Sequence, residues 1–398
     1  MISADEARHI IDAISALGQV ETVTVDQALD RICAADIPAR ITHPPFRASA
    51  MDGYAVRLED VRHAGAKLKV IGESRAGEAA GQLLDPEAAI RIFTGGVVPE
   101  GADHVIIQEN VERKGGTITT CADQAVSANI RRAGIDFCEG DILKRGGARL
   151  NAIDVGLLAA ANIADVRVFR RPVIAYFDNG DELVELGSKL QHGQIIGSNR
   201  FALDGMIREW GGEPVYLGKA GDTLEKVVAK FEAGLDADIV MSVGGASVGD
   251  HDHVRTAFER MNGQFLFQKI AMKPGKPTWF GALGETHVLG LPGNPASALV
   301  CATLFLQPLI NRLGGSSDDR PASLQARLAS PLKANGQREN YMRGTYEVSD
   351  SGIVTVSPAD NQDSSLLSRL STANCLIRCP PDMAAQDEGA IVDCIRLT

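Results

Sequence analysis

Between residues 172 and 312 the sequence alternates short apolar runs with longer stretches of helical periodicity. The four clearest apolar runs read PVIAYF, PVYLG, DIVMSV and VLGL. Regular alternation of strand and helix predicts a parallel sheet with helices on both faces, because parallel neighbours need a long crossover connection. We therefore predict a central, doubly wound α/β domain.

The segments on either side of this region have different patterns. Short β-branched runs separated by Gly and Pro precede it, and short strands with an Asn335-Gly336 hairpin signal follow it. Helical patterns open with the capping-box sequence Ser3–Glu6 and recur at 151–163. The expected fold is multidomain α/β plus β: a helical linker (1–22 with 140–171), a β-rich module (23–139), the α/β domain (172–320) and a small C-terminal β-barrel (321–398).

Charge and cysteine usage narrow the class of protein. The formal net charge of −11 argues against a general nucleic-acid binder, so an anionic ligand would need a local cluster of Lys or Arg or a divalent cation. The seven cysteines are scattered without a CxxC, which is typical of reduced thiols in a cytosolic protein. The N-terminus is acidic and the longest apolar stretch, 155–166, contains Asn162 and Asp165. We expect a cytoplasmic protein without a membrane span.

Polar, glycine-rich turns follow all four apolar runs of the α/β region. Three of these turns carry carboxylates, which include Glu182, Asp222 and Asp252. In an open α/β sheet the carboxyl ends of parallel strands lie at one edge, where ligands bind. We therefore expect a shared ligand-binding rim.

The loop SVGGASVGDHDHV after the third apolar run has two interpretations. Gly244 and Gly245 permit close backbone approach, so consecutive N–H groups and the following helix start can bind an anion; the same loop can equally be a plain turn. His251 and His253 lack the i, i+4 spacing of a helical metal pair and fit solvated helix-start residues. Asp252 is suited to Mg²⁺, directly or through water.

Two further loops offer anion-binding groups. Lys273 and Lys276 flank a Pro-Gly turn in KPGKP, where prolines stiffen the chain, and they are either ordinary surface lysines or ligands of an oxyanion. In LPGNPAS, Asn294 and Pro295 are the expected N-cap and first residue of a helix, with Ser297 in its first turn.

The β-rich module contains two unusual stretches. HPPFRASAMDGYAV surrounds Asp52 with apolar side chains and is either a buried corner or a lid over a planar ligand. Thr94-Gly95-Gly96 ends a predicted strand and forms another cluster of backbone donors. Asp136 and Ser364 carry no indication of function on their own.

Taken together and in this order, these stretches resemble the molybdopterin molybdenumtransferase family, the MoeA and gephyrin E-domain group, over nearly the whole chain. The matching segments are SAMDGYAV, TGGVVPEGADHVIIQE, IRRAGID, GDEL, SVGGASVGDHD, KPGKP, LPGNPAS, NYMRG and SxxAN. The resemblance implies a MogA-like α/β domain and insertion of molybdate into adenylylated molybdopterin with Mg²⁺, which releases AMP and active molybdenum cofactor. It also implies an elongated homodimer whose cleft lies between the α/β domain of one subunit and the β module of the other.

The resemblance implies roles for individual residues. The implied catalytic residues are Asp52, Thr94, Asp136, Glu182, Asp222 and Asp252, of which the last three would position Mg²⁺. The expected substrate-binding residues are Gly244, Gly245, Ser247, Lys273, Lys276, Pro277, Pro292, Gly293, Asn294, Ser297, Arg343 and Ser364. Three departures from the family pattern are Asn179 in place of Thr, Gly197 in place of Asp or Arg, and Asp363-Ser364-Ser365 in place of Gly-Ser-His. The last leaves open whether Ser364 or Ser365 is the ligand.

Two other functions remain open at the level of sequence. One is a molybdopterin adenylyltransferase on the same α/β core, and the other is a non-catalytic molybdopterin-binding scaffold. The expected partners are a second copy of the chain, small anionic substrates, the molybdopterin adenylyltransferase and molybdoenzyme chaperones, with no nucleic acid and no membrane.

Overall fold

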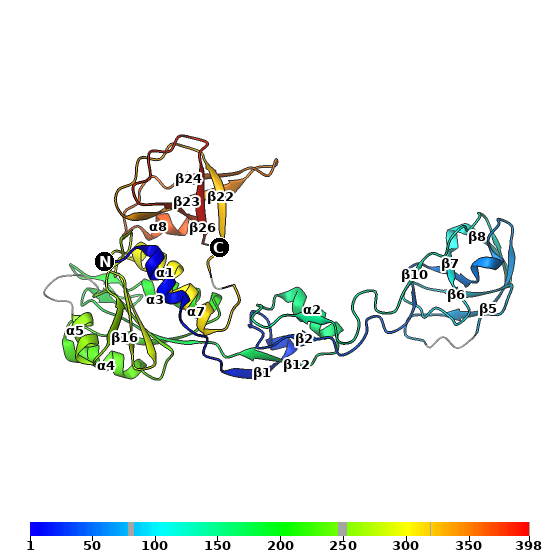
Figure 1. The fold of residues 1–398 in the computed structure, drawn as a ribbon, viewed down its shortest axis with the longest axis horizontal. Helices are drawn as coiled ribbons and strands as arrows, with labels where there is room; N and C mark the ends of the chain where they lie inside the picture. Colours follow the sequence, from blue (N-terminus) through cyan, green and yellow to red (C-terminus); the bar gives the residue numbers. More distant parts are fainter. Residues whose placement is uncertain (79–82, 246–252, 319, 398) are drawn as a thin grey trace.

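A computed structural model describes residues 1–78, 83–245, 253–318 and 320–397. Figure 1 shows an elongated molecule with the α/β domain and the C-terminal barrel at one end and a β-sheet module at the other. A slender middle part joins the two ends. The multidomain α/β plus β fold class is confirmed.

The α/β domain is built on a six-stranded sheet of order β16-β13-β17-β21-β20-β18. The four predicted strands are parallel: β13 (Val173–Asp178), β16 (Glu213–Lys219), β17 (Ile239–Val243) and β21 (Thr286–Leu291). Two strands that the sequence analysis did not anticipate, β20 (Trp279–Leu283) and β18 (Gln264–Phe267), extend the sheet in antiparallel pairing. A two-residue turn at Gly284 joins β20 to β21, so no crossover helix is needed there.

The helices of this domain follow the predicted pattern. They are α3 (Asn199–Glu209), α4 (Leu224–Gly234), α5 (His253–Arg260) and the continuous stretch α6 (Pro295–Cys301), η4 (Ala302–Leu306) and α7 (Gln307–Leu313). Residues Pro295–Leu313 are long and apolar enough to cross a membrane, but 89% of this stretch is buried inside the protein. It is the core helix of the domain, and η4 is π-helical.

The first helix, α1 (Ala4–Asp12), begins at the predicted capping box, in which Glu6 N donates to Ser3 Oγ at 3.1 Å and Ser3 N donates to Glu6 Oε2 at 2.7 Å. Its buried face contains Ala4, Ala7 and Ile11, which belong to the same core as the apolar face of α7. Helix α1 therefore packs on the α/β domain, away from residues 140–171, with which we grouped it.

The middle part has its own small core. Strand β1 (Val20–Thr24) pairs with β12 (Asp165–Phe169), and β2 (Ile37–Pro38) pairs with β11 (Ile142–Lys144). Helix α2 (Ala152–Ala160) and the short turn η1 (Val25–Gln27) pack around Cys33, Leu150 and Val168. Residues 25–39 thus contribute to this part as well.

The distant β module contains a sheet of order β7-β4-β6-β5-β9-β8. Its strands are β4 (Gly53–Val56), β5 (Lys67–Ser74), β6 (Ala88–Ile92), β7 (His104–Ile107), β8 (Val111–Lys114) and β9 (Thr117–Thr120). The short strands β3 (Ala48–Ser49) and β10 (Ile130–Arg131) pair beside this sheet, and the helical turns η2 (Leu58–Asp60) and η3 (Gln108–Asn110) follow β4 and β7.

The C-terminal domain is a closed five-stranded barrel. Its strands are β22 (Ser323–Leu328), β23 (Glu339–Val348), β24 (Val354–Pro358), β25 (Cys375–Cys379) and β26 (Ile391–Arg396), closed by pairing of β23 with β25. The short helix α8 (Leu367–Ser371) follows β24. The hairpin predicted at Asn335-Gly336 is wrong, because β22 and β23 do not pair. The Asn335 side chain instead donates to the carbonyls of Arg338, Cys379 and Pro380, and so fixes the approach to β23.

One strand outside the barrel belongs to its sheet. Strand β19 (Met272–Lys273), from the α/β region, pairs in parallel with the start of β23, with Lys273 opposite Asn340. Glu339 N donates to Ala271 O at 3.0 Å in the same junction. The lysine loop is therefore attached to the barrel by backbone hydrogen bonds.

Candidate active site

The turns after the parallel strands meet at one edge of the sheet, as predicted. The turns after β13, β17 and β21 line a pocket of about 460 Å³, whereas Asp222, in the turn after β16, is not among the lining residues. Its residues are Asn179, Glu182, Gly244, Gly245, Lys269, Lys276, Pro277, Pro292, Gly293 and Asn294. The in-register pairing of β13, β17 and β21 places their ends side by side, which explains why residues more than 100 positions apart in sequence share this pocket.

Glycine is required where the loops of this rim touch. Gly244 and Gly245 have φ angles of 90° and 66°, a region that side-chain-bearing residues rarely adopt. A Cβ on Gly244 would lie 2.4 Å from the carbonyl oxygen of Asn179. Glycine at this position therefore lets the loop after β17 pack directly against the loop after β13. Ser247 and Asp252, in the same loop, lie outside the described residues.

Hydrogen bonds join the neighbouring loops of the rim. Asp222 Oδ2 accepts from the backbone N–H of Asp181 at 3.3 Å, and Lys219 Nζ donates to the carbonyl of Leu183 at 2.9 Å. The Glu182 carboxylate folds back over Gly180. Just after these residues, the short parallel pair β14 (Leu183–Val184) and β15 (Ile195–Ile196) continues the loop.

Buried groups beneath the rim are polar. Asp178 ends β13, accepts from the Tyr216 hydroxyl at 3.0 Å, and has its pKa raised by burial. The Asn199 side chain donates to the carbonyl of Gly293 at 2.8 Å and joins helix α3 to the loop after β21.

Of the three predicted Mg²⁺ ligands, the structure describes Glu182 and Asp222. Glu182 and Asp222 are the hard oxygen ligands that Mg²⁺ prefers, and Asp222 retains a second carboxylate oxygen beyond its bond to Asp181. Within residues 1–78, 83–245, 253–318 and 320–397, no three His, Cys, Asp or Glu side chains gather as a metal site. The donor chemistry of these two carboxylates fits Mg²⁺ with waters in its remaining positions.

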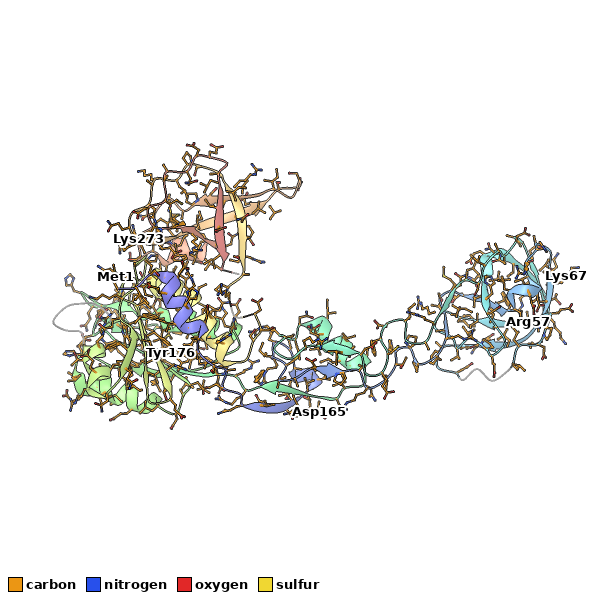
Figure 2. The ribbon with its side chains drawn as sticks, viewed as in Figure 1. Met1, Arg57, Lys67, Asp165, Tyr176 and Lys273 are labelled. Carbon is orange, nitrogen blue, oxygen red and sulfur yellow. The ribbon has the colours of Figure 1, made fainter. Side chains whose placement is uncertain are left out.

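A second pocket of about 650 Å³ adjoins the first and shares Lys276, Pro277, Pro292 and Asn294 with it. Its other lining residues are Lys273, Pro274, Gly275, Ser297, Arg338, Asn361, Gln362, Asp363 and Ser364. Figure 2 shows Lys273 where the α/β domain meets the barrel, at the opposite end of the molecule from Arg57 and Lys67. The second pocket thus lies between the two domains.

The barrel docks against the start of α6 through Ser364. Asn294 Nδ2 donates to Ser364 Oγ at 2.9 Å, and Ala296 N donates to Ser364 O at 3.1 Å. Asn294 therefore occupies the predicted N-cap position while its side chain contacts the barrel. Ser365 does not line the pocket; its N–H and hydroxyl donate to Asp363 Oδ1 at 2.9 and 2.6 Å and hold the pKa of that carboxyl low. The geometry favours Ser364 over Ser365 as the residue that faces a ligand.

Arg343 is not part of the lining. Its side chain is only 1% exposed, and Nη2 donates to the carbonyls of Asn361 at 3.3 Å and Asp363 at 3.1 Å. Burial lowers its pKa. Arg343 thus supports the loop that carries Ser364, and its Nε lacks a partner in the part of the chain that the structure describes.

Asp52, Thr94 and Asp136 belong to the distant β module and the strand connections beside it, and the fold of one chain does not bring them to the rim (Figure 1). Asp52 Oδ1 accepts from the N–H and the hydroxyl of Thr94 at 2.7 and 2.8 Å, and these bonds lower the pKa of Asp52. Asp136 N donates to His43 O at 3.3 Å. Asp52 and Thr94 form a polar pair in the β module, and Asp136 lies in the connection beside it.

Several lining residues were not among the predicted site residues: Asn179, Lys269, Pro274, Gly275, Arg338, Asn361, Gln362 and Asp363. Lys269 lies close in sequence to the two predicted lysines, so the density of lysine in this stretch was a usable signal. Asn179 was noted only as a departure from the family pattern. Arg338 and Gln362 carry no local signal, because they reach the pocket only through docking of the barrel.

Comparison with protein families agrees with this architecture. Residues 2–162 match the MoeA N-terminal region (domains I and II), residues 179–312 match a probable molybdopterin binding domain, and residues 325–397 match the MoeA C-terminal region (domain IV). The molybdopterin molybdenumtransferase of Haemophilus influenzae is 39% identical over 95% of this chain and 94% of its own length. The protein of that name from Bacillus subtilis is 30% identical over 98% and 93%.

The chain belongs to the molybdopterin molybdenumtransferase family. The predicted resemblance is therefore confirmed, and the protein is a transferase of molybdenum cofactor biosynthesis that acts on a molybdopterin-related substrate. A crystal structure of a molybdopterin biosynthesis MoeA protein from Pyrococcus horikoshii superposes with a TM-score of 0.84 at 28% identity, over 100% of both chains. A second structure from that source gives 0.83 at 32% identity, over 100% of this chain and 99% of the other.

Proposed function

We propose that this chain inserts molybdate into adenylylated molybdopterin with Mg²⁺ and releases AMP and active molybdenum cofactor. The observation that carries the proposal is the junction of the two pockets at Lys276, Pro277, Pro292 and Asn294. The first pocket offers backbone groups and the Glu182 carboxylate beside Lys269 and Lys276, and the second offers further cations. Two reactants that repel each other can thus be held at adjoining positions in a protein of net charge −11.

The chain's own groups supply positioning and electrostatic stabilisation. Glu182 and Asp222 would hold Mg²⁺, which neutralises charge on the pyrophosphate of the substrate; Asp252 is the expected third carboxylate. Lys273 and Lys276 would bind the molybdate dianion, with Ser297 and Ser364 as hydroxyl donors. The loops held by Asp222 and Lys219 are fixed before substrate arrives, which lowers the reorganisation needed during reaction.

No cysteine of this chain is needed as a nucleophile. Molybdenum would attach to the dithiolene sulfurs of the pterin, with a displaced molybdate oxygen leaving as water. Water would cleave the phosphoanhydride that links AMP to the pterin phosphate. The proposed state is a cytoplasmic homodimer. In such a dimer Asp52, Thr94 and Asp136 of one subunit would face the rim of the other, and the adenylyltransferase and molybdoenzyme chaperones would deliver substrate and accept product.

The direct test is to mix the purified chain with adenylylated molybdopterin, Mg²⁺ and molybdate and to measure AMP. We expect Asp222→Ala and Lys276→Ala to keep the fold and to lower molybdate-dependent AMP release by about a hundredfold or more, since each removes a preorganised charge. Lys333→Ala, which removes an exposed barrel lysine outside both pockets, is the matched control.

The same assay separates the other candidate functions. Normal AMP release by both variants would refute the residue assignment. Consumption of ATP with release of pyrophosphate in the absence of molybdate would identify an adenylyltransferase. Tight binding of the adenylylated pterin without any AMP would identify a scaffold.

A further inference from the structure

The second pocket contains a cation to which neither the sequence nor the family resemblance assigned a role. Arg338 lines this pocket together with Lys273 and Lys276 and is exposed. Its backbone carbonyl accepts from Asn335 Nδ2 at 2.9 Å, which fixes the chain at this point. Its guanidinium makes no ion pair or hydrogen bond within the described residues. The same is true of the two lysine ammonium groups.

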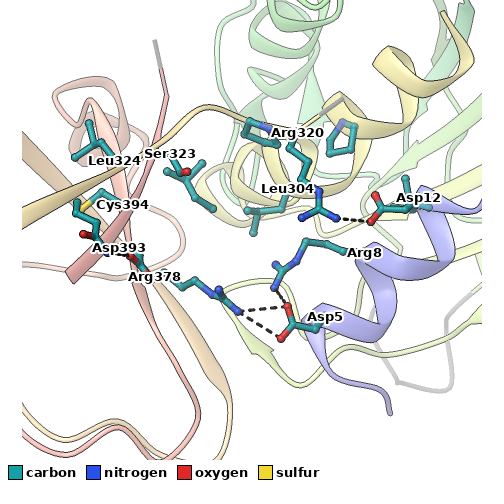
Figure 3. A pocket seen from close by; sticks show the side chains of 15 residues that line it. Asp5, Arg8, Asp12, Leu304, Arg320, Ser323, Leu324, Arg378, Asp393 and Cys394 are labelled. Atoms are coloured by element: carbon teal, nitrogen blue, oxygen red, sulfur yellow. Dashed lines mark hydrogen bonds and ion pairs between the residues drawn. The ribbon is translucent and has the colours of Figure 1, made fainter. Parts of the chain in front are cut away.

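Other arginines near the barrel have partners. In the cavity of about 700 Å³ between α1 and the barrel, Arg320 pairs with Asp12 at 2.9 Å and Arg378 pairs with Asp5 at 3.3 Å (Figure 3). Arg8 also pairs with Asp5 there. That cavity has balanced charge and gives no reason to bind an ion. The contrast shows that the unpaired state of Arg338 is a local property of its pocket.

The carboxylate next to Arg338 in sequence, that of Glu339, already pairs with other arginines. Glu339 is 3% exposed and pairs with Arg378 and with Arg8, so it cannot neutralise its neighbour. Its backbone N–H bonds to Ala271, so the start of β23 lies beside the strand that carries Lys273. The fold therefore holds Arg338 beside the lysine loop.

The balance of charge in the lining identifies the ligand class. Three cationic side chains face one carboxylate, that of Asp363, which leaves an excess of two positive charges. A compact dianion compensates such a lining, whereas a monoanion leaves one positive charge unpaired. Resting on the proposed function, we propose that Arg338 is a specificity-determining residue that makes this pocket select tetrahedral dianions such as molybdate over monoanions of the same shape.

The probes are molybdate and perrhenate, which are tetrahedral oxyanions of similar size with two and one negative charges. Binding of each to the full chain is measured by equilibrium dialysis at fixed ionic strength, without pterin. For Arg338→Gln we expect molybdate affinity to fall about tenfold and perrhenate affinity about threefold, because the Coulomb energy lost is proportional to the charge of the anion. Arg338→Lys should keep the preference for the dianion.

Lys333→Gln is the matched control, since it removes one exposed charge from the same connection between β22 and β23 but does not line the pocket. It should leave both affinities unchanged. If the wild-type chain binds molybdate and Arg338→Gln binds both anions as the wild type does, this inference is wrong while the proposed function stands. If the wild-type chain binds no molybdate, both are wrong.

Discussion

At the scale of the residue, the most clearly defined interaction in the β module is the pair Asp52 and Thr94. Both donors of Thr94 point at the same carboxylate oxygen, and they hold the pKa of Asp52 below its ordinary value, the backbone N–H contributing most. An ionised carboxylate with a second free oxygen is suited to orient a cation or a water molecule in a facing site.

Thr94→Val should raise the pKa of Asp52 toward its ordinary value but not fully, because the backbone N–H at position 94 remains. Thr94→Ser keeps the hydroxyl and should leave the pKa as in the wild type. The measurement is an NMR titration of the Asp52 carboxyl carbon. Equal pKa values in the valine and serine variants would show that the side-chain bond has no effect on Asp52.

Single residues also show how far the sequence could be interpreted. Glu182 and Gly244 could be placed correctly, because strand ends in a parallel sheet have a fixed geometry. Arg343 and Arg338 could not, since the sequence does not reveal which of two nearby arginines is buried against backbone carbonyls and which faces the pocket. The choice between Ser364 and Ser365 also needed the structure, because Ser365 is bonded to Asp363 through its N–H and its hydroxyl.

At the scale of the element, strand β7 contains a buried titratable group. Ala128 N donates to His104 Nδ1 at 3.0 Å, and Nε2 lies 3.1 Å from Gln124 Oε1, so a neutral ring with its proton on Nε2 satisfies both neighbours. Burial lowers the pKa of His104. A proton on Nδ1 would break the bond from Ala128.

The stability of the β module should therefore depend on pH in a defined direction. The pKa of histidine in an unfolded chain is about 6.5, and the pKa of His104 in the folded protein is lower. The neutral His104 ring therefore contributes its full stabilisation above about pH 6.5, and this contribution is lost as the pH falls through the folded-state pKa. Thermal unfolding between pH 7.5 and 5 should show a smaller fall in melting temperature for His104→Gln than for the wild type. His63→Gln, at an exposed position, should behave like the wild type; equal slopes for all three would refute the role of His104.

Some strands and helices could be predicted from the sequence, and others could not. The four parallel strands and their helices could be predicted, because burial on both faces produces unbroken apolar runs. Strands β18 and β20 were missed, although Trp279 on β20 is fully buried. Gly290 makes room for it, since a Cβ there would lie 1.9 Å from Trp279 Nε1. A glycine inside a strand indicates close packing but not the identity of the packing partner.

At the scale of the whole molecule, two groups of predicted site residues lie far apart within one chain. The rim and the Asp52 region lie at opposite ends of an elongated subunit (Figure 1). No short-range pattern in a sequence specifies such a separation, because it depends on the middle part built from residues 20–39 and 137–169. If both regions serve one reaction, they must come from different subunits.

This arrangement can be tested by complementation between two inactive variants. Asp52→Ala and Asp222→Ala are purified, unfolded together, refolded as a mixture, and assayed for AMP release. A two-fold dimer with shared sites would contain one intact site per mixed dimer, so activity should return to about a quarter of the wild-type value. Each variant refolded alone is the control. No recovery, with mixed dimers shown by mass spectrometry, would place the complete site within one chain.

The attachment of β19 to the barrel limits how the second pocket can adapt. Lys273 belongs to the α/β region by sequence, yet its backbone pairs with the start of β23. The C-terminal domain that contains β23 also carries Arg338 and Ser364. A tilt of the barrel would carry all three together and leave their spacing intact. Room for a larger ligand must therefore come from the opposite wall, where Lys276 and the first turn of α6 line the pocket.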